Sequence, residues 1–243
     1  MPGLNRDTAI TYLGHSTVLI ETPGGKRVLI DPWTVGNPAC PTEWKPVDSL
    51  GTLDLILITH IHSDHVGDAQ AIIHANPQAS VVGIFEACNW LATKGASKLR
   101  PMSKGGTQIV EGLTLTMTHA IHSSSFTEAD GSVSYGGEPA GYIIRCENGF
   151  TIYAAGDTGL FGDMALLHDL YHPDLALLPI GDLFTMGPFQ AAHAIRLLRV
   201  DHVVPIHYAT FPALTGTPEA LREYTQDMPG LFIHDIQPGE SLR

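Results

Sequence analysis

The segment Thr59-His60-Ile61-His62-Ser63-Asp64-His65 decides how this 243-residue chain is expected to fold. It directly follows residues 53–58, a short run rich in Leu and Ile that is typical of a buried strand. The polar segment is therefore expected at the C-terminal end of that strand. Open α/β sheets bind their ligands at this end of their strands.

The same segment carries the residue types that bind transition metals. Imidazole nitrogen and carboxylate oxygen are ligands of zinc, iron and manganese. In extended chain His60 and His62 face the same side, while Asp64 and His65, after a bend, can serve a second ion. A solvated turn that happens to be rich in histidine is the alternative. Three histidines and an aspartate within six positions favour the metal site.

Composition excludes several classes of protein. The formal net charge is −12 with only 13 Lys and Arg, which argues against a broad nucleic-acid surface. Cys40, Cys88 and Cys146 form no C-x-x-C pair, so neither a disulfide framework nor a thiolate zinc site is expected. The N-terminal residues lack a signal-peptide pattern, and no apolar run approaches the ~18–20 residues that span a bilayer. We expect a cytoplasmic protein that binds no membrane.

Hydrophobic patterning predicts an α/β fold in two successive halves, each with strands first and α/β units after. Because no Gly- or Ser-rich linker separates the halves, we expect residues 1–243 to form one domain. Its two mixed β-sheets should pack face to face with helices outside. The predicted strands are 8–13, 16–21, 27–30, 53–58, 80–84, 108–118, 140–146, 150–155, 175–180, 202–206 and 231–236, and the predicted helices are 66–75, 86–94, 163–171, 188–199 and 217–227.

Three later strand ends offer further ligands. Residues 119–124 contain His119 and His122, Asp157 follows the apolar strand at 150–155, and His207 follows the strand at 202–206. A lone His or Asp at a strand end is more often structural. Together with residues 60–65 at a shared edge, these residues indicate one metal site.

On these residues the chain resembles the metallo-β-lactamase superfamily, whose H-x-H-x-D-H motif, later His, Asp and final His match residues 60–65, 122, 157 and 207. More closely, it resembles a family of metal-dependent hydrolases related to ascorbate-6-phosphate lactonases and, more distantly, to N-acyl-phosphatidylethanolamine phospholipase D. The resemblance covers nearly the whole chain and implies an αββα sandwich. Further matching stretches are residues 12–17, 29–32, 155–158, 180–188 and 204–212.

The resemblance implies two divalent metal ions, zinc first, with manganese, iron or nickel as alternatives. A hydroxide between the ions would hydrolyse a small ester, lactone or phosphodiester, and Asp64 would orient it. The implied ligands are His60, His62 and His122 for the first ion, Asp64, His65 and His207 for the second, and Asp157 as the bridge.

The third ligand of the first ion has two candidates. His119 continues the inward phase of its strand, whereas the family pattern favours His122. Three other residues are candidates for orienting ligands or for contacting substrate. Asp31 and His15 end or follow strands near the same edge, and Asp182 begins a loop after the strand at 175–180.

Other functions remain open as alternatives. A flavodiiron-like redox protein would carry a Glu where this chain has a His, together with a flavodoxin-like domain. A non-enzymatic metal-binding or scaffold protein would usually lose ligands that are all present here. We expect a small-molecule substrate, with phosphorylated compounds included, and both a monomer and a homo-oligomer fit the sequence. Exported β-lactamase activity and tRNA-processing ribonuclease activity are not expected.

Overall fold

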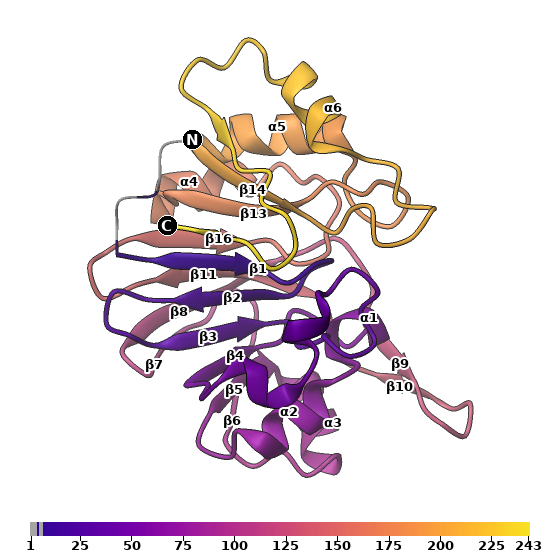
Figure 1. Ribbon diagram of the computed structural model, residues 1–243. Helices are drawn as coiled ribbons and strands as arrows, with labels where there is room; N and C mark the ends of the chain where they lie inside the picture. The colour runs from indigo at the N-terminus through magenta and orange to yellow at the C-terminus, as the bar shows by residue number, and fades with distance from the viewer. Residues whose placement is uncertain (1–3, 5–6) are drawn as a thin grey trace.

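Two seven-stranded sheets form the body of the computed structural model, which describes residue 4 and residues 7–243 (Figure 1). The first sheet has the order β16-β1-β2-β3-β4-β5-β6 and the second β15-β14-β13-β12-β11-β8-β7. The strands of the first sheet are β1 (Ala9–Tyr12), β2 (Val18–Glu21), β3 (Arg27–Ile30), β4 (Leu55–Leu57), β5 (Ser80–Ile84), β6 (Leu99–Met102) and β16 (Ser241–Leu242). Those of the second are β7 (Thr107–Val110), β8 (Leu113–His119), β11 (Ala140–Arg145), β12 (Thr151–Ala154), β13 (Leu175–Pro179), β14 (His202–Ile206) and β15 (Phe232–Ile233).

Helices lie on the outer sides of the two sheets. Figure 1 shows α4, α5 and α6 along the second sheet and α2 and α3 beside the first. The helices are α1 (Ser63–Val66), α2 (Ala69–Ala75), α3 (Phe85–Thr93), α4 (Met164–Tyr171), α5 (Pro188–Leu198) and α6 (Pro218–Tyr224), with short 3₁₀ turns η1 (Thr42–Trp44) and η2 (Val47–Leu50). The predicted αββα arrangement is therefore confirmed. No helix in the described part of the chain is both long and apolar enough to cross a membrane.

One hydrophobic core joins the two sheets. Leu29 and Ile56 of the first sheet and Leu115 and Ile144 of the second are all fully buried and belong to one packed cluster. Burying a side chain of this size contributes about 1.5–3 kcal/mol. Because this core draws on both sheets, we infer that the chain is one domain.

The structure differs from the sequence prediction in several details. Strands β6 and β16 were not predicted, and two hairpins differ as well. The single strand predicted at 108–118 is broken at Glu111 and Gly112, where φ is 52° and 88°. Two consecutive positive φ values suit a tight hairpin turn, so β7 and β8 pair antiparallel. A second hairpin, β9 (Ser125–Thr127) with β10 (Val133–Tyr135), was not predicted and projects from the body in Figure 1.

The topology brings the ends of several strands to one edge. Strands β8 and β12 both run antiparallel to β11, and β12, β13 and β14 are parallel, so their C-terminal ends share one edge of the second sheet. In the first sheet β3 and β4 are parallel and β1 runs in the same direction. The Tyr142 hydroxyl donates to the Ile58 carbonyl at 2.7 Å, and Ala140 N–H donates to the Thr59 carbonyl at 2.9 Å. These contacts hold the two edges together.

Candidate metal centre

Three imidazoles converge from the two sheets into what we call the histidine triad, formed by His60, His62 and His122. The first two follow β4 in extended chain, and the third follows β8. His60 Nε2 lies 2.9 Å from His62 Nδ1, which lies 3.2 Å from His122 Nε2. Nitrogens about 2.0–2.1 Å from a tetrahedral zinc ion would be about 3.3 Å apart. The spacing therefore suits one ion bound between the three rings.

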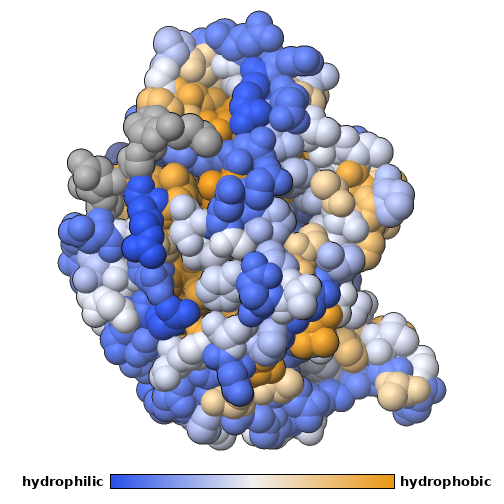
Figure 2. Space-filling view, in the orientation of Figure 1, coloured by the Kyte–Doolittle hydropathy of each residue, from blue (hydrophilic) through white to orange (hydrophobic). Residues whose placement is uncertain are grey.

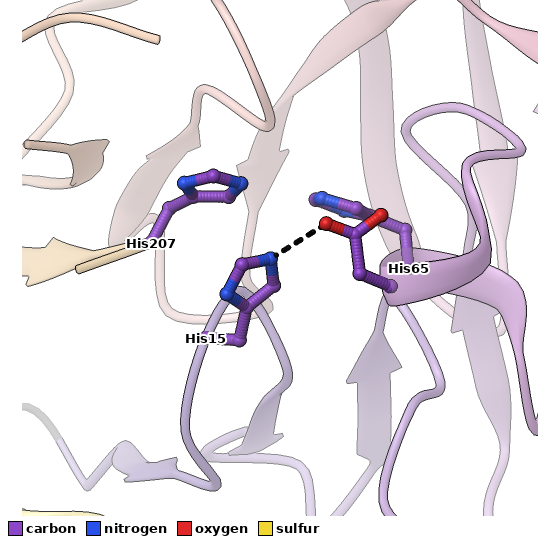
Figure 3. Close-up of side chains that lie close together, drawn as sticks. His15, His65 and His207 are labelled. Atoms are coloured by element: carbon purple, nitrogen blue, oxygen red, sulfur yellow. Dashed lines mark hydrogen bonds and ion pairs between the residues drawn. The ribbon is translucent and has the colours of Figure 1, made fainter. Parts of the chain in front are cut away.

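A second group, the mixed quartet, lies beside the triad and consists of His15, Asp64, His65 and His207. One ligand atom from each lies within 4.8 Å of all the others. Asp64 and His65 belong to the short helix α1, His15 follows β1, and His207 follows β14. Figure 3 shows the rings of His15, His65 and His207 turned toward one another from these separate elements.

Asp157 connects the two groups. Its Oδ2 lies 3.0 Å from His207 Nε2 and 3.5 Å from His122 Nε2, and its Oδ1 lies 3.3 Å from His65 Nε2. The preceding Gly156 has φ 61°, and a Cβ there would lie 2.8 Å from the Thr59 Cβ. Only glycine fits this turn without strain. The sequence Gly-Asp at the end of β12 thus delivers one carboxylate to both groups.

The residues present fit bound cations. His65 Nε2 and Asp157 Oδ1 are buried and, among the described residues, have no hydrogen-bond partner apart from their contact with each other at 3.3 Å. Buried polar atoms normally have such partners, and a cation between them would satisfy both. The donor set of imidazoles and carboxylates is the set that zinc takes.

Asp31 orients His65. Its Oδ2 accepts from the Thr59 hydroxyl at 2.7 Å and lies 2.8 Å from His65 Nδ1, and its Oδ1 accepts from Thr59 N–H at 2.9 Å. Asp31 is 1% exposed. The contact leaves His65 Nε2 as the nitrogen that faces Asp157. This is the arrangement in which a carboxylate fixes the ring of a ligand histidine.

His15 holds Asp64. Its Nε2 lies 3.1 Å from Asp64 Oδ2, and its Nδ1 lies 3.0 Å from the Thr210 hydroxyl. Burial lowers the pKa of His15 to about 4, although the bond to Asp64 opposes the shift. His15 is therefore neutral at pH 7 and can donate one N–H to Asp64, which leaves Nδ1 to accept from Thr210.

Burial decides the protonation state of the triad, whereas neighbouring charges decide that of His65 and Asp157. Burial lowers the pKa of His60, His62 and His122, so the triad is neutral at pH 7. Burial acts in the same direction on His65, but Asp157 and Asp31 outweigh it and raise its pKa well above the ordinary value. Burial would raise the pKa of Asp157, yet His207 and His65 lower it well below its usual range.

The predicted site residues divide into those that meet and those that do not. All seven proposed ligands, together with His15 and Asp31, gather at the shared edge. His119 is exposed at the end of β8, with its Nδ1 3.2 Å from Lys104 Nζ. The alternation that favoured His119 fails because the strand ends at that residue, beyond the cover of the core. Whether the gathered residues ligate metal remains a prediction.

Asp182 lies outside both groups. Its Oδ1 accepts from the N–H of the neighbouring Leu183 at 2.9 Å, within an exposed loop. Sequence reasoning had not singled out Thr210, which contacts His15, or Thr158, whose hydroxyl accepts from Ile121 N–H at 2.9 Å. The one available signal was their place beside His207 and Asp157 in the matching stretches.

Known proteins share this architecture and sequence. A family model described as the beta-lactamase superfamily domain matches residues 26–208. A UPF0173 metal-dependent hydrolase of Roseiflexus sp. (strain RS-1) is 49% identical over 245 aligned positions, which cover 100% of both chains. One of Rubrobacter xylanophilus is 50% identical over 236 positions, or 97% of this chain and 96% of that protein.

A solved structure agrees with these relatives. That of Igni18, a metallo hydrolase from the hyperthermophilic archaeon Ignicoccus hospitalis, superposes with a TM-score of 0.83 at 36% identity and covers 96% of this chain and 97% of that one. The chain therefore belongs to the beta-lactamase superfamily and, within it, to the UPF0173 metal-dependent hydrolases.

Proposed function

We propose that the protein is a dinuclear hydrolase of small esters, lactones or phosphodiesters. One observation carries the proposal: the histidine triad and the mixed quartet lie side by side, and the Asp157 carboxylate contacts members of both. Seven candidate ligands are too many for one tetrahedral ion. Two divalent ions, when bound here, would lower the pKa of a water molecule toward neutrality and polarise the oxygen of the substrate's carbonyl or phosphoryl group.

The protein's own groups would position the reacting water. Asp64 is the quartet member with the most exposed side chain, 29%, so its carboxylate can reach solvent and orient an attacking water by accepting a hydrogen bond from it. His15 holds this carboxylate in place, with its Nε2 3.1 Å from Asp64 Oδ2. Burial would raise the pKa of Asp64, but the hydrogen bond from His15 and the charge of His65 keep it below its ordinary value. The carboxylate therefore stays ionised at neutral pH.

The remaining parts of the proposal concern the metal and the cell. The imidazole-rich set favours zinc over harder ions, with manganese, iron and nickel as alternatives. Cys40, Cys88 and Cys146 are free and buried, which is in keeping with our proposal of a reducing cytoplasm. We propose a small-molecule substrate.

The test combines metal counting with hydrolysis. Chelator-treated protein is titrated with zinc or manganese, and bound metal is measured by elemental analysis. We expect two ions per chain and hydrolysis of 4-nitrophenyl acetate, a simple lactone or bis(4-nitrophenyl) phosphate only after loading. A plateau at one ion per chain would refute the dinuclear site. A fully loaded protein inactive on all three substrates would refute the proposed chemistry.

A further inference from the structure

Several large apolar side chains are exposed to solvent on the loops that adjoin the candidate metal centre. We call this set the apolar rim; it comprises Val35, Ile121, Leu183, Phe184 and Phe211, which are 39–65% exposed. They come from the loops that follow the strands of the shared edge. Figure 2 shows hydrophobic surface at the right-hand edge of the molecule, where Figure 1 places the loops after β13 and β14.

One side of the rim is fixed to the residue beside Asp157. Thr158 accepts from Ile121 N–H through its hydroxyl at 2.9 Å, and from Met186 N–H through its carbonyl at 3.0 Å. The loop that carries Leu183 and Phe184 starts at Gly181, where a Cβ would lie 2.1 Å from the His207 carbonyl oxygen. This loop therefore lies directly against two segments of the metal centre.

The other side of the rim is fixed to His15. The Phe211 ring lies 5.6 Å from the His15 ring and 6.1 Å from Trp33. Val35 follows two residues after Trp33, and its N–H donates to Asp68 Oδ2 at 2.8 Å. Both sides are thus held in place next to the mixed quartet.

The backbone at Leu183 is in an unfavourable conformation. Asp182 and Leu183 have φ 67° and 54°, the left-handed region that residues with a Cβ rarely adopt. Asp182 maintains the turn through its side chain and through its carbonyl, which accepts from Phe184 N–H at 2.6 Å. Two exposed apolar side chains bury too little surface to offset the cost of this strained backbone. Strain of this kind is concentrated at functional sites.

Basic residues are missing from every segment that builds or borders the centre. Residues 12–17, 31–36, 59–68, 119–124, 156–162, 180–187 and 207–216 contain no Lys or Arg. Lys104, which contacts His119 at the end of β8, is ion-paired with Glu138. A phosphorylated metabolite would normally be recognised by Arg or Lys in addition to the metals.

We propose that the apolar rim binds the uncharged, apolar part of the substrate, so that the enzyme hydrolyses esters or lactones carrying an aliphatic or aromatic group. The inference rests on the proposed hydrolase function and narrows its substrate class. Water adds across the acyl C–O bond and gives a carboxylic acid and an alcohol, with no other reactant.

The test varies chain length while the reacting group stays the same. We would measure kcat/KM for 4-nitrophenyl acetate, butyrate and octanoate, and calorimetric affinity for acetohydroxamate and octanohydroxamate, whose metal-binding group is identical. Apolar burial predicts that the longest chain gains about 10–100-fold in both assays. Equal values across the series, or a preference for bis(4-nitrophenyl) phosphate, would overturn the proposal.

Two variants locate the effect. In Leu183→Asn/Phe184→Ser the chain-length ratios should fall below about threefold, and folding should persist because Asn tolerates positive φ. Ile109→Ser on β7, 76% exposed and outside the rim, is the control and should keep the wild-type ratios. Chain-length ratios that stay unchanged in the double variant would overturn the proposal. If sedimentation also showed that the double variant converts a dimer to a monomer, the rim would be a contact between subunits instead.

The outcomes separate this inference from the function on which it rests. If no ester is hydrolysed but octanohydroxamate still binds more tightly in a rim-dependent way, the rim stands and the proposed reaction fails. If all esters are hydrolysed without regard to chain length, the reaction stands and the rim proposal fails.

Discussion

The histidine triad and the mixed quartet are built from different kinds of backbone. His60 and His62 extend regularly from β4, and no triad member has positive φ within the described part of the chain. In and beside the quartet, His15, Asp31 and His207 have φ 57°, 49° and 54°. Left-handed residues with a Cβ cost on the order of 1–3 kcal/mol each.

This difference indicates where the fold is rigid before any metal binds. Two of the quartet's rings are held by partners outside it, since Asp31 lies 2.8 Å from His65 Nδ1 and Thr210 lies 3.0 Å from His15 Nδ1. Apart from the contacts between the triad's own rings, His60 has the Thr59 hydroxyl at 3.0 Å, and His62 has the exposed Ser123 hydroxyl at 3.4 Å. We therefore expect the quartet to be preorganised and the triad to tighten on metal binding.

Asp157→Asn should affect both groups and have the largest effect. The amide keeps the shape but loses the charge that faces His65, His122 and His207. We expect less than one ion per chain and a loss of activity on the order of 10³-fold or more. Asp130→Asn, exposed in the β9–β10 hairpin, is the control for elemental analysis and turnover. Two bound ions in Asp157→Asn would rule out the bridging role.

Asp64→Asn should affect the quartet alone. The triad keeps its three imidazoles, so one ion should remain bound while turnover falls about 10²–10³-fold. Metal content and kcat measured on the same preparation separate the two effects. Near-normal turnover would show that Asp64 neither ligates nor orients the reacting water.

The sequence predicted His60 and His62 of the triad more directly than His15 of the quartet, for a physical reason. H-x-H in extended chain places both rings on one face, so a motif alone identifies His60 and His62. His15 and Asp31 reach the site through left-handed turns, whose geometry leaves no periodic signal. His119 shows the limit of periodicity, because it continues the inward phase of its strand but lies exposed at the residue where β8 ends. Residues of the second hairpin were missed since a three-residue strand is too short to show alternation.

His122→Ala should affect the triad alone and settles the choice between the two histidines. With two imidazoles left, the triad's ion should bind at least about tenfold more weakly, as loss of even an orienting partner costs 10–100-fold. His119→Ala removes an exposed side chain and should leave metal content unchanged, with stability within about 0.5 kcal/mol of wild type. Loss of metal in His119→Ala alone would show that strand phase, not the motif, identifies the ligand.

Asp31→Asn tests whether the hydrogen bond between His65 and Asp31 preorganises the quartet. The amide has one acceptor oxygen where the carboxylate has two. If that oxygen replaces Oδ2 beside the Thr59 hydroxyl and His65 Nδ1, the NH2 group faces the Thr59 N–H that Oδ1 accepts at 2.9 Å, and the side chain must shift. Affinity for the quartet's ion should fall about 10–100-fold, with the triad's ion unaffected. Competition with a chromophoric chelator measures the two affinities. Equal weakening of both ions would mean that Asp31 supports the shared edge as a whole.

The smallest expected effect is the acid sensitivity of the metal-free protein. His15, with a pKa of about 4, and the triad histidines have lowered folded-state pKa values. Their contribution to stability is present above the ordinary value of 6.5 and is lost as pH falls. The pKa of His65 is raised, so its contribution is present below 6.5 and is lost as pH rises through the folded-state pKa.

More of these histidines have a lowered pKa than a raised one. The free energy of unfolding should therefore fall from pH 7.5 to pH 5.5, on the order of 1 kcal/mol per titrating group at most. Two variants divide this loss between the triad and the quartet. His60→Gln removes a histidine that resists protonation and should flatten the dependence, whereas His65→Gln removes the opposing contribution and should steepen it. Urea melts of chelator-treated protein at the two pH values give the slopes. A wild type more stable at pH 5.5 than at pH 7.5 would mean that the ion pairs of protonated His65 with Asp31 and Asp157 dominate the pH dependence. Their stabilisation would then exceed the free-energy cost of protonating the buried rings of the triad and His15.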